Sequence, residues 1–193
     1  MRISLPGFIS TPSRKHFFYF LLLFLLFYYG NLAYMAVIDH RGFVYSPFLD
    51  NHLNYINWLR DSILYTSAFV NRCFGLSAQV SMPYRMVTNN GTWVETVYAC
   101  LGLNLFSFWA AFVLSDPGSH YRKIWWTLGG IVAIWVINVF RMAMLLMALE
   151  YNWRSIALVD HHTQFNILAY VVIGLMFLAF IKGSRANTTE AKI

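Results

Sequence analysis

Long stretches without a single charged side chain dominate this sequence. The clearest runs from His16 to Ile38, between Lys15 and Asp39, and two more lie at Thr96–Ser115 and Thr163–Ile181. About 20 mostly apolar residues in a helix are enough to cross roughly 30 Å of hydrocarbon. A chain of this length cannot bury several such runs in one soluble core, so the sequence predicts a helical membrane protein.

A fourth run, Ile124–Leu149, is long enough to span a membrane but contains Arg141. Only 11% of the 193 residues are charged, against roughly 25% in soluble domains, which excludes an ordinary soluble protein. The first run exceeds the 7–15 apolar residues typical of a signal peptide, and we interpret it as a retained anchor. We therefore expect an all-α polytopic membrane protein with about four transmembrane helices, at residues 16–38, 96–115, 124–149 and 163–181.

The positions of Lys and Arg predict the orientation, because these residues are enriched in short cytoplasmic segments. With the N-terminus inside, eight Lys and Arg lie in residues 1–15, in the 116–123 loop and in the tail 182–193, while five lie outside. The inside then carries a net charge of +6 and the outside −1. The basic balance is thus explained by topology in a cell inner membrane, and we expect no nucleic-acid partner.

The segment 39–95 forms the large extracytoplasmic part in this arrangement. Its first half repeats apolar residues at spacings of three, four and seven, namely Leu49, Leu53, Ile56, Leu59, Ile63 and Leu64. This pattern predicts an amphipathic helix, capped by Asp50 or Asn51, that packs on the membrane surface or on the helix bundle. Its second half contains Asn89-Asn90-Gly91 between two extended-looking runs, which predicts a short hairpin.

Three potentially reactive side chains fall at one predicted depth. Cys100 lies roughly 7 Å below the outer end of its predicted helix, and Arg141 lies roughly 13 Å from the outer end of the next one. The long Arg141 side chain can extend towards the outer surface. His161 and His162 occur where the last helix enters the membrane from outside. We therefore expect a thiol, a guanidinium and an imidazole to meet at the outer rim of the membrane.

Each of these residues also has a purely structural interpretation. Cys100 alone is typical of a small buried apolar residue, or of a disulfide with Cys73. Arg141 is costly inside a membrane, so it marks a functional site or forms an ion pair with Asp160, Glu95 or Glu150. The two histidines are consistent with a solvated pair, and Asn138 with a hydrogen bond between helices.

Together the three groups have a chemical logic that the separate interpretations lack. A thiolate is a strong nucleophile, an imidazole accepts and returns a proton, and a guanidinium donates fixed hydrogen bonds to an oxyanion. The sequence contains no Gly-rich phosphate loop, no pair of catalytic carboxylates and no convincing metal cluster. We therefore expect a cysteine-based enzyme that needs neither a cofactor nor a metal.

At these residues the chain resembles the exosortase/archaeosortase membrane transpeptidases, in a compact Bacteroidetes-type form. The resemblance covers about Thr96 to Tyr170 and rests on three motifs: Ala99-Cys100-Leu101-Gly102, Asn138-Val139-Phe140-Arg141-Met142, and His162 followed by Phe165, Asn166 and Tyr170. The chain departs from the family pattern at Leu101, where Ser is usual, at Met142, and at Asn166, where Gly is usual. These departures bear on substrate choice.

The resemblance implies a cysteine protease and transpeptidase that acts on C-terminal sorting signals of secreted proteins at the extracytoplasmic surface. The catalytic residues would be Cys100, Arg141 and His162, with support from His161, Asn138 and Asp160. The acyl group would pass to a lipid or glycan acceptor or to water. Two other functions stay open from the residues alone: a non-catalytic membrane module that binds an acidic partner or a lipid through Arg141, and a thiol acyltransferase that acts on lipid.

Overall fold

The chain is mostly helical, as expected. A computed structural model describes residues 11–81, 83–153, 167 and 170–182. Its elements in chain order are α1 (Thr11–Ile38), α2 (Pro47–His52), α3 (Tyr55–Cys73), β1 (Ala78–Ser81), β2 (Arg85–Thr88), β3 (Trp93–Glu95), a 3-10 turn η1 (Tyr98–Leu101), α4 (Leu103–Ser115) and α5 (His120–Glu150). A further apolar helix covers Tyr170–Lys182.

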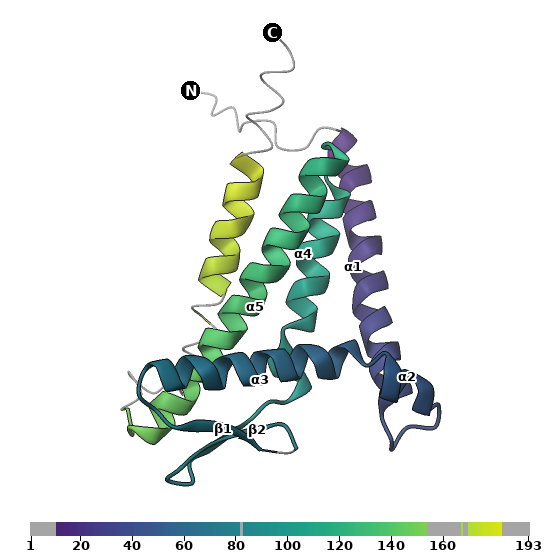
Figure 1. The fold of residues 1–193 in the computed structure, drawn as a ribbon. Coiled ribbons are helices and arrows are strands. Elements are labelled where there is room, and N and C mark those ends of the chain that lie inside the picture. Colours follow the sequence, from purple (N-terminus) through teal and green to yellow (C-terminus); the bar gives the residue numbers. More distant parts are fainter. Residues whose placement is uncertain (1–10, 82, 154–166, 168–169, 183–193) are drawn as a thin grey trace.

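Four helices run along one common direction, and α3 crosses them at one end (Figure 1). The start of α1, the connection from α4 to α5 and the end of the Tyr170–Lys182 helix lie together at the opposite end. We call this the basic end, because it carries Lys15, Arg122, Lys123 and Lys182. The end with α3 and the three strands is called the sheet end.

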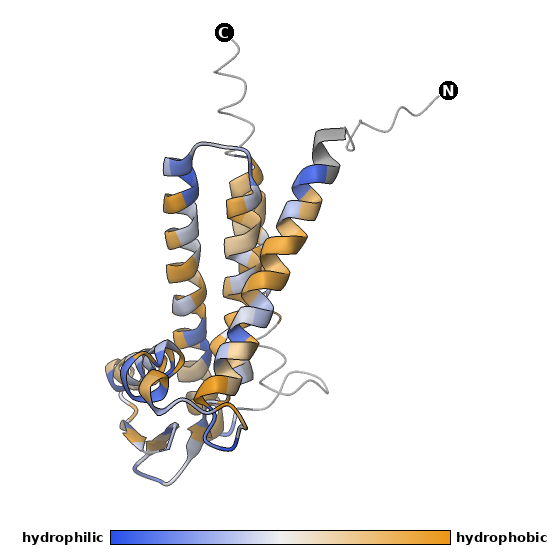
Figure 2. Cartoon of the chain, turned by 90° about the vertical axis from the view of Figure 1, so that its right-hand side faces the viewer, coloured by the Kyte–Doolittle hydropathy of each residue, from blue (hydrophilic) through white to orange (hydrophobic). Residues whose placement is uncertain are grey.

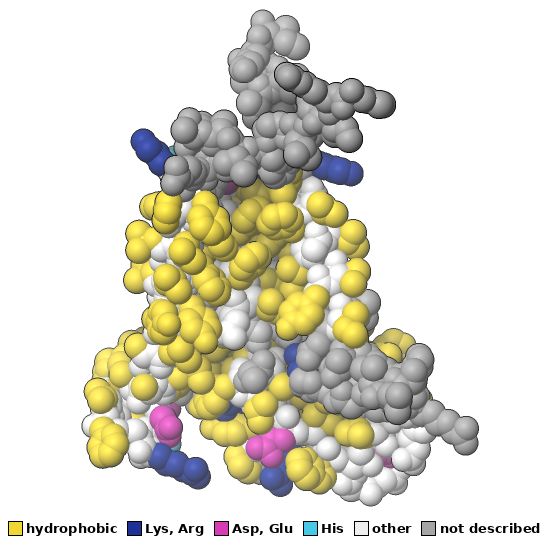
Figure 3. Space-filling model, turned by 180° about the vertical axis from the view of Figure 1, so that it is seen from behind, with side chains coloured by type: hydrophobic (Ala, Val, Ile, Leu, Met, Phe, Trp, Pro, Cys, Tyr) yellow, Lys and Arg dark blue, Asp and Glu magenta, His cyan; other side chains and the backbone are white. Residues whose placement is uncertain are grey.

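Two of the described helices are long and apolar enough to cross a membrane, Lys15–Ile38 within α1 and α5. Large apolar side chains such as Leu22, Leu26 and Val132 are exposed on their outer faces. Figure 2 shows that the hydrophobic residues of these helices lie between the two ends, and Figure 3 shows the apolar side chains there, with Lys and Arg side chains towards both ends. An exposed apolar belt of this kind is typical of a surface solvated by lipid.

The predicted helix over 96–115 is the main correction to the sequence analysis. Only its second part is α-helical, because α4 begins at Leu103 and has 13 residues. At 1.5 Å per residue α4 is about 20 Å long, which is less than the thickness of a hydrocarbon core. Residues 154–166 and 168–169, which include the first part of the predicted last span, lie outside the described residues, and the rest of that span is helical over Tyr170–Lys182.

The predicted hairpin is confirmed and belongs to a larger sheet. Strands β2 and β3 pair antiparallel on either side of the Asn89–Gly91 turn, where Gly91 adopts a φ of 87°. The sequence did not predict the third strand, β1, which pairs with β2. Val94 and Met86 of this sheet are buried in the same apolar core as α3.

The predicted start of the amphipathic helix is wrong. Neither Asp50 nor Asn51 caps it; a short α2 ends at His52, and the side chain of Asn54 caps α3 by accepting a hydrogen bond from the backbone of Asn57. Asp50 instead accepts from Asn54 at 2.7 Å.

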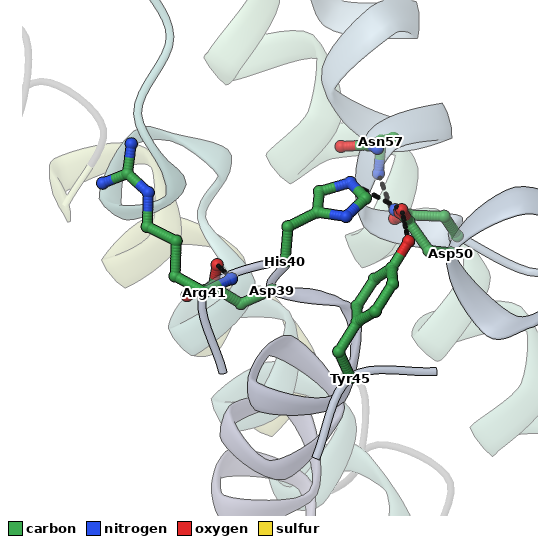
Figure 4. A network of polar contacts seen from close by, with 7 residues as sticks. Asp39, His40, Arg41, Tyr45, Asp50 and Asn57 are labelled. Carbon is green, nitrogen blue, oxygen red and sulfur yellow. Dashed lines mark hydrogen bonds and ion pairs between the residues drawn. The ribbon is translucent and has the colours of Figure 1, made fainter. Parts of the chain in front are cut away.

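A polar network at Asp50 ties the end of α1 to α2 and α3. As Figure 4 shows, His40 and Tyr45 also point at this carboxylate, each at 3.0 Å. Partial burial and the hydrogen bond to Asp50 raise the pKa of the Tyr45 phenol above its usual 10.0. The network fixes the sharp turn between the long helix and the crossing one.

Helices α4 and α5 approach closely where Trp109 meets Gly130. A Cβ atom on Gly130 would lie 1.7 Å from the indole nitrogen of Trp109, so no larger residue fits without a shift. The same indole nitrogen donates to the backbone oxygen of Trp126 at 2.9 Å. This contact fixes α4 against α5 and thereby positions the residues at the sheet end of both helices.

Candidate active site

Cys100 lies in the 3-10 turn η1, ahead of α4 rather than inside a membrane helix. The chain leaves β3 in an extended conformation, and the backbone N–H of Cys100 donates to Val97 at 2.8 Å. Gly102 then takes a φ of 74°, which side chains other than glycine rarely adopt, and α4 begins at the next residue. This glycine turns the chain from η1 into α4 and leaves Cys100, 8% exposed, at the sheet end of the helix.

Arg141 reaches Cys100 from α5. Its Nη2 donates a hydrogen bond to Cys100 Sγ at 3.2 Å, although the two residues are 41 positions apart in the chain. The predicted meeting of the thiol and the guanidinium is therefore confirmed. A charged donor of this kind stabilises the thiolate form of cysteine, which is the nucleophilic form.

Asn138 fixes the same region one helical turn before Arg141. Its Nδ2 donates to the backbone oxygen of Leu101 at 3.2 Å, and the residue is only 3% exposed. A Cβ atom on Gly102 would lie 2.7 Å from the same nitrogen. Asn138 thus bonds α5 directly to the turn that carries Cys100, as expected of a hydrogen bond between helices, and its supporting role in catalysis stays a prediction.

Cys100 and Arg141 line a pocket of about 640 Å³ between three helices. Side chains of α1, of the stretch from η1 into α4, and of α5 contribute to its wall, together with Tyr170. The wall mixes apolar residues with polar ones, among them Leu32, Met35, Asn31 and Asn104. A pocket of this size accommodates several residues of an extended peptide or one lipid chain.

The histidines and Asp160 are not part of the described structure. His161, His162 and Asp160 fall within residues 154–166, so their predicted roles stay predictions. Tyr170, the last residue of the same motif, lines the pocket beside Cys100 and Arg141. The beginning of the final described helix therefore lies at the site, eight residues after His162 in the chain.

Three structural alternatives from the sequence do not hold. The disulfide is wrong, because Cys73 and Cys100 are not bonded to each other; Cys73 is exposed and Cys100 is buried. Glu95, a suggested ion-pair partner of Arg141, instead pairs with Arg85 at 3.1 Å. Glu150, the second suggested partner, accepts hydrogen bonds from Thr88 and Asn90.

Sequence reasoning missed a buried arginine behind the site. Arg60 of α3 is 1% exposed, and its guanidinium carbon lies 3.7 Å from the ring centre of Tyr84 and 4.4 Å from that of Tyr98. Within the described residues its Nε and Nη1 have no hydrogen-bond partner. Tyr84 adopts a φ of 63°, which is unfavourable for a bulky residue. Since Tyr98 lines the pocket, this stack supports one wall of the site.

The sequence contained one indication that Arg60 is buried, namely its position in the apolar pattern of α3. It follows Ile56 by four residues and precedes Ile63 by three, so it lies on the buried face of the helix.

In the described part of the chain, no group of three His, Cys, Asp or Glu side chains could hold a metal ion. The chain matches no family model, no curated protein and no solved structure.

Proposed function

We propose that this protein is a membrane-embedded cysteine transpeptidase that cleaves C-terminal sorting signals of secreted proteins. The contact of 3.2 Å between Arg141 and Cys100 carries the proposal. Two such residues from different helices, at the edge of a pocket, form a nucleophile with an adjacent charged donor. The resemblance of the Cys100, Arg141 and His162 motifs to exosortases supports the same reaction.

The first half of the reaction forms a thioester. The Cys100 thiolate attacks the carbonyl carbon of the scissile peptide bond, and the electron pair of the C=O bond moves to its oxygen. Guanidinium N–H groups of Arg141 donate to this oxyanion. When the intermediate collapses, the C–N bond breaks, and the leaving amine takes the proton that His162 accepted from the thiol.

The second half releases the acyl group. An amine or hydroxyl of a lipid or glycan, or a water molecule, attacks the thioester while His162 takes its proton. The C–S bond breaks and Cys100 leaves as the thiolate, so the enzyme returns to its starting state. Water gives hydrolysis, whereas the other acceptors give transfer of the protein to a new anchor.

The position of the pocket suits a substrate held in the membrane by its own helix. Leu32 and Met35 of α1 form one side of the pocket, and Leu103 at the start of α4 forms another. These residues lie at the sheet end of helices whose outer surfaces are apolar. A sorting signal that ends in a membrane helix presents the bond before that helix at the same level.

The proposal predicts a loss of processing when the nucleophile is removed. In cells that carry Cys100→Ala in place of the natural chain, secreted proteins with C-terminal membrane helices should accumulate as full-length precursors, as mass spectrometry of their C-termini would measure. The matched control is Cys73→Ala, which removes the other cysteine and should process normally. Unchanged C-termini in the Cys100→Ala cells would favour a non-catalytic membrane module.

The two histidines are expected to behave differently. The sequence predicts a helix that starts near Asp160, and neighbouring side chains of a helix point about 100° apart, so we expect only one histidine to face the thiol. His162 keeps the family spacing to Tyr170, and His162→Ala should abolish thioester formation, whereas His161→Ala should only weaken it. The reverse order would assign the base to His161.

A further inference from the structure

The contacts of α3 give the level at which this helix crosses α5. Ser67 Oγ donates to the backbone oxygen of Val139, and the indole nitrogen of Trp135 donates to Ser62 Oγ, both at 3.0 Å. Counted from Ile124, Val139 lies about 22 Å along α5 and Trp135 about 17 Å. A hydrocarbon core is roughly 30 Å thick, so α3 meets α5 about 8 to 13 Å before the far boundary.

The contacts of α1 give the same depth for α3 independently. The Tyr55 hydroxyl at the start of α3 donates to Asn31 Oδ1 at 2.5 Å, and Asn31 Nδ2 donates to Ser107 of α4 at 2.9 Å. Counted from His16, Asn31 lies about 22 Å along α1, which again leaves about 8 Å to the far boundary. With the near boundary at Ile124 and His16 and both helices upright, the two counts favour a position of α3 below the surface of the bilayer.

One face of α3 exposes aromatic side chains at this level. Trp58 and Tyr65 are both 58% exposed and Phe69 is 59% exposed. With 100° per residue, all three lie within 60° of Ser62 around the helix. Ser62 bonds Trp135, which is nearer the basic end than Val139, so the aromatic side of α3 is the side that turns towards the membrane interior.

We propose that α3 is embedded in the bilayer leaflet at the sheet end, with Trp58, Tyr65 and Phe69 in contact with lipid. This face contacts lipid at the boundary between acyl chains and headgroups, where tryptophan and tyrosine are enriched. Helices α1 and α5 expose large apolar side chains as well, among them Leu26 and Val132. Three large aromatic residues on one exposed side of a helix favour lipid over water as its surroundings.

The covering of Arg60 fits this depth. A charged side chain within the hydrocarbon is costly unless protein groups surround it. Arg60, on the opposite side of α3 from Tyr65, is enclosed by the rings of Tyr84 and Tyr98 and does not meet the lipid face. If the proposed transpeptidase reaction holds, on which this last step rests, the scissile bond is cleaved at the acyl–headgroup boundary rather than in open water.

Spin-label accessibility tests the depth of α3 in the full chain reconstituted in phosphatidylcholine vesicles. Single nitroxide labels are attached at Tyr65→Cys and Phe69→Cys in a chain with Cys73→Ser and Cys100→Ser. Label collision with oxygen should exceed collision with the polar complex Ni-EDDA several-fold, as for the lipid-facing control Leu22→Cys. The aqueous control Asn90→Cys, in the β2–β3 turn, should show the reverse preference.

Labels at both α3 positions that behave like Asn90→Cys would overturn the proposal. A second measurement uses the chain without labels: vesicles of brominated phosphatidylcholine should quench a fraction of tryptophan fluorescence that is smaller in Trp58→Phe, and an unchanged quenched fraction would also overturn it. The labelled protein lacks Cys100, and the quenching reports only the depth of Trp58, so neither result depends on catalysis. Failure of the transpeptidase reaction would leave the depth of α3 standing.

Discussion

At the scale of single residues, the arrangement of donors around Cys100 is the central feature. Arg141 Nη2 lies 3.2 Å from the sulfur, and Asn138 holds the backbone of the same turn. A guanidinium is a rigid plane with five N–H donors, whereas an ammonium is a flexible point charge. The site therefore depends on the shape of Arg141 as well as on its charge.

Arg141→Lys is accordingly expected to impair processing severely although the charge is kept. Loss of a directed oxyanion donor typically costs about 2.7–4 kcal/mol, or roughly 100- to 1,000-fold in kcat. Rates of precursor cleavage in reconstituted membranes measure the effect. Arg85→Lys, which changes an exposed pair with Glu95, is the matched control and should cleave at the natural rate. Near-natural cleavage by Arg141→Lys would show that Arg141 contributes its charge and not directed hydrogen bonds to the oxyanion.

The sequence predicted the meeting of Cys100 with Arg141 because residue counting along α5 placed Arg141 near the sheet end, although the helix assumed for Cys100 is a 3-10 turn. Asn138 followed from its spacing of three residues before Arg141. Arg60 was missed because it was counted as one of the outside charges. Its stack with Tyr84 and Tyr98 joins residues from three separate elements, and no local pattern encodes such a contact.

At the scale of elements, Gly102 separates the 3-10 turn from α4. Hydropathy alone shows one apolar run from Thr96 to Ser115, and this is why the sequence predicted one helix there. A single residue at a φ of 74° interrupts that run, with Leu103 as the first residue of α4. The glycine was visible in the sequence, but no local pattern indicated its left-handed conformation or the close approach of Asn138.

Gly102→Ala is expected to destabilise the protein and abolish processing. The left-handed conformation costs a residue with a Cβ about 1–2 kcal/mol, and the new methyl group would displace the Asn138 side chain. Gly91→Ala is the control, since it has a φ of 87° but no atom within 4 Å of the new Cβ. Both variants should lower the Tm in detergent, yet only Gly102→Ala should lose cleavage.

The contact between the end of α5 and the β2–β3 hairpin couples pH to stability. It is made by Glu150, the last residue of α5, which follows the apolar segment. Hydrogen bonds from Thr92, Thr88 and Asn90 hold the pKa of its carboxyl below the usual 4.5. A carboxyl with a lowered pKa in the folded state stabilises the fold above pH 4.5, and this contribution is lost as the pH falls through the folded-state pKa.

Thermal unfolding of the natural chain should therefore show a drop in Tm below about pH 4.5 that is smaller in Glu150→Gln. At neutral pH the variant should be the less stable of the two, because glutamine cannot accept the same charge-assisted hydrogen bonds from the β2–β3 turn. Identical pH profiles for the two proteins would show that the turn is not held by this carboxylate.

At the scale of the whole molecule, the basic end and the sheet end face different compartments in our account. An impermeant maleimide added to intact cells should label Asn90→Cys at the sheet end. Ser119 is the N-cap residue of α5 at the basic end, and Ser119→Cys should react only after the membrane is permeabilised. Both variants carry Cys73→Ser and Cys100→Ser to leave one thiol. Labelling of Ser119→Cys in intact cells would reverse the orientation and place the site on the wrong side for secreted substrates.

The group bound to Cys100 tests the central claim most directly. The protein is purified from its native membrane under acidic conditions that preserve thioesters, and mass spectrometry determines the mass added to Cys100, with His162→Ala and Cys73 as controls. We predict a hydroxylamine-sensitive adduct on Cys100 alone, whose fragments give the C-terminal residues of a secreted protein, and no adduct in His162→Ala. A fatty acyl adduct would identify a lipid acyltransferase instead, and an unmodified Cys100 in every preparation would contradict a thioester mechanism.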